Sequence, residues 1–186
     1  LRTNKYDLCV HIYFKNNKWP SLDYPDKVFP LIHGNGRLNN EKLKYLKGLR
    51  NHPKENDLVY MSIMWSRPDN RYQNYHAIFE HHTRTFETLA AINCRSYLLA
   101  VIPQIYPEKD ILPYLRRLDK AGVPWQRDWG TVSSKVLFDE LAKAEVVYLR
   151  PGNALCISWR MIDLMAMGAC VAYDGQPFPN WPQPLE

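Results

Sequence analysis

Beyond residue 57, the chain alternates short apolar runs with longer segments in which apolar residues recur at helical spacing. The runs are rich in β-branched and aromatic residues and end at Pro, Gly, Asn or Ser, a pattern typical of buried strands. Helix-forming residues dominate the longer segments, and Gly122 and Gly168 stand where a helix would end. The pattern predicts strands over 58–64, 96–102, 125–132, 146–149 and 170–173, and helices over 76–92, 110–121, 135–144 and 157–167.

This alternation predicts an α/β fold. Strands that alternate with helices form a parallel sheet with helices on its faces, so we expect a Rossmann-like sheet of about five or six strands. Residues 1–57 differ, because a strand-like run over 6–14 is followed by a loop-rich stretch and a short helix over 41–49. We therefore divide the chain into an N-terminal portion, 1–57, that bridges to or contributes to a second lobe, and a Rossmann-like domain, 58–186.

Composition narrows the class of protein. A chain of 186 residues with 46% hydrophobic residues can bury the core of one domain. No apolar run approaches the ~18 residues of a membrane span, and the first residues lack the apolar core of a signal peptide. The chain begins at Leu1, which suggests a fragment or a processed product. The cysteines are widely spaced and form no CxxC pair, so we expect buried free thiols in a reducing, cytoplasmic compartment: Cys9, Cys94, Cys156 and Cys170.

The net charge of +5 suits an anionic ligand, although a modest excess of surface lysine is also common. Nucleic-acid binding is not expected, because charges of both signs are mixed along the chain and no RNP-like, helix-turn-helix or zinc pattern occurs. Peripheral contact with an anionic membrane face stays open. Side chains of adjacent helix residues point about 100° apart, so His81 and His82 are predicted to lie on a solvated helix face rather than to share a metal ion.

The segment from Leu141 to Phe178 carries the strongest motif. It predicts a strand, a Pro/Gly/Asn loop, a helix and a second strand, the usual architecture for binding a phosphate group. Backbone N–H groups at the helix start would receive a diphosphate, Ser158 would add a hydroxyl donor, and Arg160 a charge contact.

Residues 58–178 resemble the C-terminal, nucleotide-sugar-binding domain of GT-B glycosyltransferases, over about two thirds of the chain. The sequence IDLMAMG at 162–168 is similar to that family's acidic-x-Met-Ala-x-Gly helix end, RPG at 150–152 to its Pro-containing loop, and 133–146 to its preceding helix and strand. The resemblance implies transfer of a sugar from a nucleotide-diphosphate sugar to a hydroxyl acceptor such as a glycan. It needs no metal cofactor if cations and a helix dipole stabilise the leaving diphosphate.

The resemblance also implies site residues. The carboxylate of Asp163 would accept hydrogen bonds from ribose hydroxyls, although a solvated carboxylate or one paired with Arg160 is the alternative. The guanidinium groups that follow the first strand suit phosphate oxygens, but a solvated turn would look the same. The aromatic segment near 129–132 would meet the nucleobase, or simply bury a tryptophan. The full candidate binding set is Arg67, Arg71, Trp129, Thr131, Val132, Asn153, Ser158, Arg160 and Asp163.

One position departs from the family pattern. Many retaining members carry a glutamate where this chain has Leu155, so inversion is slightly favoured. The catalytic base is not identified, and a full acceptor-binding lobe is hardly present in this sequence. The alternative function is therefore a non-catalytic nucleotide- or glycan-binding module. An NAD-dependent oxidoreductase is disfavoured, because no GxGxxG follows a predicted strand.

Overall fold

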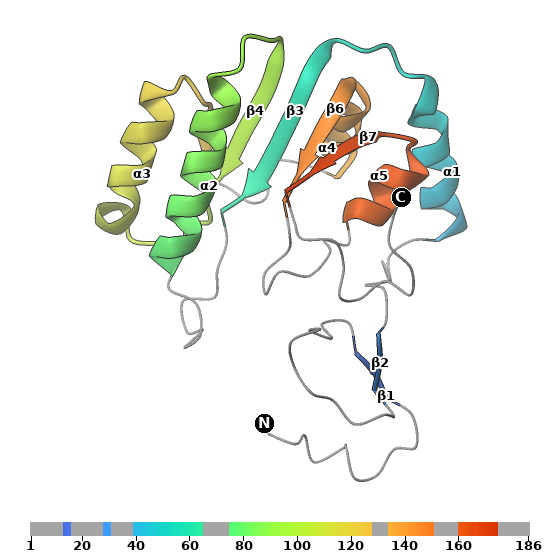
Figure 1. Ribbon diagram of the computed structural model, residues 1–186, viewed down its shortest axis with the longest axis horizontal. Coiled ribbons are helices and arrows are strands. Elements are labelled where there is room, and N and C mark those ends of the chain that lie inside the picture. Colours follow the sequence, from blue (N-terminus) through green and yellow to red (C-terminus); the bar gives the residue numbers. More distant parts are fainter. Residues whose placement is uncertain are drawn as a thin grey trace.

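The computed structural model describes residues 13–15, 28–30, 39–64, 75–127, 134–150 and 160–174. Its main feature is a five-stranded parallel sheet in the order β5-β4-β3-β6-β7 (Figure 1). The strands of this sheet are β3 (Asn56–Ile63), β4 (Ser96–Val101), β5 (Trp125–Gln126), β6 (Ala144–Leu149) and β7 (Cys170–Tyr173). A separate parallel pair is formed by β1 (Tyr13–Lys15) and β2 (Val28–Pro30).

The helices that connect these strands confirm the predicted α/β class. They are α1 (Asn40–Gly48), the short 3₁₀ helix η1 (Leu49–Asn51), α2 (Tyr75–Ala90), α3 (Glu108–Lys120), α4 (Ser134–Ala142) and α5 (Arg160–Ala166). Both predicted helix stops are confirmed: Gly122 and Gly168 have φ of 69° and 66°, the left-handed conformation that glycine adopts most readily. None of the described helices is long and apolar enough to cross a membrane.

Two hydrophobic cores lie on opposite faces of the sheet. Successive side chains of a strand point to opposite faces, so Leu58 and Tyr60 of β3 join the core under α2 and α3, whereas Val59 and Met61 join the core under α1, α4 and α5. Figure 1 shows α2 and α3 gathered beside β3 and β4, and α1, α4 and α5 gathered about β6 and β7. The layers are those of a doubly wound Rossmann-like domain.

Two basic side chains that follow α1 bond to the ends of α4 and α5, the other helices on the same face of the sheet. Arg50 Nε donates to the backbone oxygen of Ala166 at 3.0 Å, and Lys54 Nζ donates to that of Ala142 at 2.8 Å. These carbonyls belong to the last residues of α5 and α4, where acceptors lack helical partners and a positive charge is favoured. The segment after α1 therefore caps both helices that follow β5 in the sequence.

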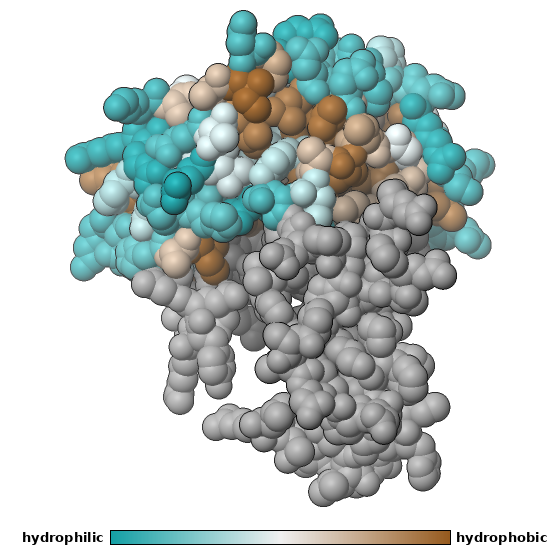
Figure 2. All heavy atoms as spheres, in the orientation of Figure 1, coloured by the Kyte–Doolittle hydropathy of each residue, from teal (hydrophilic) through white to brown (hydrophobic). Residues whose placement is uncertain are grey.

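The α2 side of β6 and β7 leaves apolar surface accessible. Val146 and Tyr148 of β6 pair in register with Cys170 and Ala172 of β7, and paired residues share a face. Cys170 and Ala172 are exposed there, and Figure 2 shows apolar side chains on the surface of this part of the sheet. The predicted burial is therefore wrong for Cys170; Cys94 is half-buried, and both thiols are free.

The strand pairing changes where the sheet reverses its order. β3 pairs with β4 as far as Ile63–Val101, and β6 pairs with β7 as far as Leu149–Tyr173. The pairing of β3 with β6 ends earlier, at Val59–Val147. The carboxyl ends of β3 and β6 therefore separate, as Figure 1 shows. This is the topological switch point of the sheet, where open α/β folds bind their ligands.

Candidate functional site

Polar side chains collect at the carboxyl ends of three strands, on the α2 side of the sheet. We call them the switch-point cluster: Tyr60, Ser62, His82, Tyr148, Arg150 and Asp174. The alternation of strand positions brings them to one face, because members from the same strand are two residues apart. His82 comes from the second turn of α2, which begins at this edge of the sheet.

His82 is the hydrogen-bonding centre of the cluster. Its Nδ1 lies 3.1 Å from the Tyr60 hydroxyl and 3.2 Å from the Ser62 hydroxyl. Burial lowers the pKa of His82 to about 3, and the positive charge of Arg150 and the neighbouring His81 add to the effect. The ring is therefore neutral at physiological pH. The predicted solvated helix face is correct for the exposed His81 but wrong for His82, which is half-buried and bonded.

Tyr60 links this histidine to a guanidinium group. Its side chain is 2% exposed, and its ring centroid lies 4.6 Å from that of Phe86 and 5.3 Å from that of Tyr148. Burial raises the pKa of Tyr60 to about 12, although hydrogen bonds with Ser62 and Arg150 oppose the shift. The hydroxyl keeps its proton at physiological pH and can donate it to Nδ1 of His82, 3.1 Å away.

Arg150, directly after β6, is buried without a full set of partners. Its side chain is 10% exposed, and its Nε lies 3.4 Å from Asp174 Oδ2. In the part of the chain that the structure describes, its buried Nη1 has no hydrogen-bond partner. The carboxylate of Asp174 also lies close enough to Tyr148 to raise its pKa, which burial and this charge bring to about 12. A buried cation with an unused donor is unusual in folded proteins.

The lowered pKa of His82 predicts a pH-dependent stability. In the unfolded chain, His82 is protonated below its ordinary pKa of 6.5. In the native protein, its ring stays neutral until the pH falls to about 3. His82 therefore leaves stability intact above pH 6.5 and lowers it as the pH falls from there towards 3, by at most about 1.4 kcal/mol per pH unit. Urea unfolding of wild type and His82→Asn at pH 7.5, 6, 5 and 4.5 measures the difference in slope.

Asparagine keeps an acceptor near the position of Nδ1 and does not titrate. The comparison at pH 7.5 isolates the loss of the ring, and the difference between the two pH slopes isolates the proton. Parallel slopes for the two proteins would show that His82 titrates normally in the native state.

Arg160 and Asp163 are the members of the predicted binding set that the structure describes. Arg160 begins α5, and its Nη1 donates to the backbone oxygen of Met61 at 3.0 Å. Met61 lies just beyond the last β3–β6 pair, so Arg160 reaches the switch point from the α5 side. Burial lowers the pKa of Arg160.

Asp163 lies one helical turn further along and faces α1. Its side chain is 0% exposed, and its Oδ1 and Oδ2 lie 2.9 Å and 3.0 Å from Lys42 Nζ. Its ion-pair partner is therefore a lysine of α1, and the carboxylate is not solvated. A contact with a ribose stays a prediction. The rest of the predicted set lies outside the described residues: Arg67, Arg71, Trp129, Thr131, Val132, Asn153 and Ser158.

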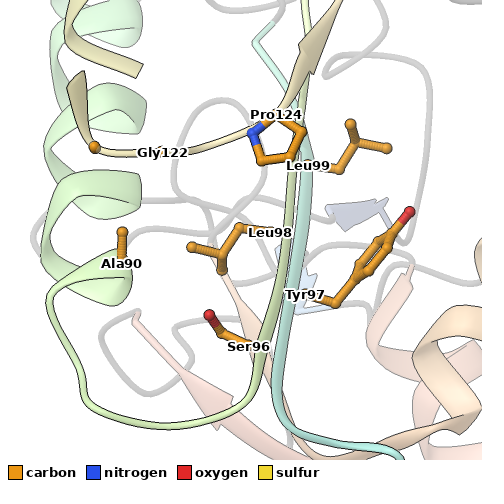
Figure 3. A pocket seen from close by; sticks show the side chains of 8 residues that line it. Ala90, Ser96, Tyr97, Leu98, Leu99, Gly122 and Pro124 are labelled. Atoms are coloured by element: carbon orange, nitrogen blue, oxygen red, sulfur yellow. The ribbon is translucent and has the colours of Figure 1, made fainter. Parts of the chain in front are cut away.

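A hollow of about 300 Å³ lies at the opposite, amino end of β4. Figure 3 shows Tyr97 and Leu99 on one side of the strand, and Leu98 on the other, facing Ala90. Its other lining residues are Ser96, Ala121, Gly122 and Pro124. The lining carries no charged side chain, so the hollow does not suit a diphosphate. Among the described residues, no three metal-ligating side chains come together either.

No family model, curated protein or solved structure matches this chain. The fold assignment therefore rests on the order of the sheet, and the proposal for a function rests on the side chains at the switch point.

The sequence held a signal for the residues that were missed. Arg150 and Asp174 each follow a strand that was predicted as parallel, and Ser62 lies near the carboxyl end of another. The carboxyl ends of parallel strands meet at one edge, so polar residues at three such ends indicate a shared site. Tyr60 carried no such signal, because a tyrosine within a strand is usually part of the core.

Proposed function

We propose that this chain is the donor-binding part of a glycosyltransferase, which binds a nucleotide-diphosphate sugar and transfers its sugar to a hydroxyl acceptor. The observation that supports the proposal best is the switch point itself. The two halves of the sheet separate beyond Val59–Val147, and a guanidinium group stands on each side, Arg150 on the α2 face and Arg160 at the start of α5.

The charges at this edge suit a leaving diphosphate. Sugar transfer releases a nucleoside diphosphate, so preorganised cations lower the barrier without a metal ion. In the sequence, Arg67 and Arg71 come after β3, and Asn153 and Ser158 come after β6. In the proposal they bind the phosphates, Trp129, Thr131 and Val132 bind the nucleobase, and Asp163 the ribose.

A thermal-shift series with UDP, GDP, ADP and CDP tests the proposal. At a concentration near 100 times Kd, a ligand adds about 2.7 kcal/mol to the stability, which corresponds to a rise in Tm of about 5–10 °C for a chain of this size. We expect at least one diphosphate to reach this shift at millimolar concentration. The matched nucleosides are the control, because they lack the phosphates and should shift Tm far less.

No shift with any of the four diphosphates would contradict the proposal. Where one binds, the corresponding nucleotide sugars are then incubated with the protein, and release of free diphosphate is followed over time. Release shows that the chain supports chemistry, whereas tight binding without release favours a non-catalytic nucleotide-binding module.

A further inference from the structure

We infer that the buried guanidinium of Arg150 is a phosphate subsite, at which one phosphate group of a diphosphate ligand accepts hydrogen bonds from the donor atom that the protein leaves unused. The inference rests on the proposed function for the identity of the ligand as a nucleoside diphosphate. The position itself is new, because Arg150 was not among the residues that the sequence pattern selected for binding.

In the unliganded protein, the buried guanidinium of Arg150 lacks a full set of hydrogen-bond partners among the described residues. Burying a charged group is unfavourable by several kcal/mol unless partners satisfy it, yet Nη1 of this 10% exposed side chain has no hydrogen-bond partner in the described part of the chain. The contact of Nε with Asp174 is 3.4 Å long, and the Asp174 side chain is 40% exposed. The carboxylate thus compensates the guanidinium only in part, and an oxyanion would complete its hydrogen bonds.

The guanidinium of Arg150 is flanked by groups of two strands. It lies close enough to the Tyr60 hydroxyl of β3 to lower the pKa of that hydroxyl, and Asp174 contacts it from the end of β7. Tyr60 is fixed in turn by His82 and by its packing against Phe86. A cation flanked in this way keeps its orientation when no ligand is present, which reduces the entropy that binding must overcome.

The charged groups around Arg150 are mostly positive. Arg160 lies close enough to Tyr60 to influence its pKa, and Arg84 acts in the same way on His81. Burial holds His82 neutral and also lowers the pKa of His81. Of the groups that face Arg150, only Asp174 is negative, so within the described residues the field at this edge favours an anion.

The test compares wild type with Arg150→Met, Arg150→Lys and Arg116→Met. Isothermal titration measures the affinity for inorganic pyrophosphate and for UDP, GDP, ADP and CDP. Arg150→Met should weaken every probe that wild type binds by about tenfold to hundredfold, the range for a charged hydrogen bond. Arg150→Lys keeps the charge but loses the planar fork, so its loss should be smaller. Arg116→Met removes the same charge from an exposed position of α3 and should bind as wild type does.

The Tm of the unliganded variants separates a subsite from a structural role. An apolar side chain relieves the burial of an incompletely paired cation, so Arg150→Met should unfold at the same or a higher temperature than wild type. A lower Tm in both Arg150 variants, or pyrophosphate and nucleotide affinities equal to those of wild type, would overturn the inference. If wild type and Arg150→Met bind the probes equally, the proposed function can still hold through the other cations. If wild type binds none of the probes, both the subsite and the proposed function are contradicted.

Discussion

Replacing Lys42 with methionine should lower the free energy of unfolding by about 3–5 kcal/mol. Lys42 Nζ lies within 3.0 Å of both oxygens of Asp163, a carboxylate with 0% exposure. Without the lysine, a carboxylate with 0% exposure loses its ammonium partner in a low-dielectric interior. Lys42 also lies 5.0 Å from the centre of the Phe138 ring, a favourable contact that the substitution would remove as well. Urea unfolding at neutral pH measures the change.

Two further variants make this measurement specific. Lys44→Met removes the same charge from an exposed position of α1 and should change stability by less than about 0.5 kcal/mol. The double variant Lys42→Met with Asp163→Leu replaces the whole pair by apolar groups and should regain most of the loss. If Lys42→Met unfolds within about 1 kcal/mol of wild type, the pair is not a significant element of the fold.

The double variant also separates the two roles of Asp163. A purely structural carboxylate can be replaced together with its lysine while the affinity for a nucleoside diphosphate stays unchanged. A carboxylate that also binds the ribose cannot, and the affinity then falls by about tenfold to hundredfold. The burial of Asp163 against α1 makes this distinction necessary, because loss of binding in Asp163→Ala alone would have two explanations.

Truncation of Phe86 to alanine should cost about 3–5 kcal/mol. Phe86 is 0% exposed in the core beneath α2, and its ring centroid lies 4.6 Å from that of Tyr60. The truncation leaves a cavity directly beside the tyrosine that bonds to His82. We therefore expect lost stability together with weaker nucleoside-diphosphate binding, measured by urea unfolding and by titration of the folded variant.

The controls for Phe86 vary the size and the position of the change. Phe86→Leu keeps most of the volume, so its cost should stay below about 1.5 kcal/mol. Ile92→Ala truncates an apolar side chain that is 48% exposed, and its smaller effect shows how much of the loss is due to burial. A loss in Phe86→Ala no greater than that in Ile92→Ala would contradict the packing described here.

The fold could be predicted because the sequence patterns that specify its strands and helices are local. Most strands of the main sheet are apolar runs bounded by breaking residues, and α3 and α5 are followed by glycines in the left-handed conformation, Gly122 and Gly168. The strand order required the structure, because the sequence does not state which of the parallel strands are neighbours. The short β5 also shows the limit of propensity: the described part of the predicted strand over 125–132 pairs only at Trp125 and Gln126.

The site was harder to predict, because some of its contacts join residues that are far apart in the sequence. The Lys42–Asp163 pair joins residues that are 121 positions apart, and no local pattern indicates such a contact. His82, by contrast, was predictable in principle. It follows Phe79 by three positions and precedes Phe86 by four, so helical periodicity places it on the buried side of α2.

The two cores differ in how their residues are spread along the chain. The core beneath α2 and α3 draws its buried residues from 58–123, whereas the opposite core joins Leu46 and Leu49 to residues as distant as Met167. Closing a long loop costs entropy before its contacts form. During synthesis, β3, α2, β4 and α3 can therefore consolidate first, while α1 stays without its α5 partner until the ribosome has passed residue 166. We therefore expect the middle of the chain to be the earliest structured unit, and the pair that fixes Asp163 to form later.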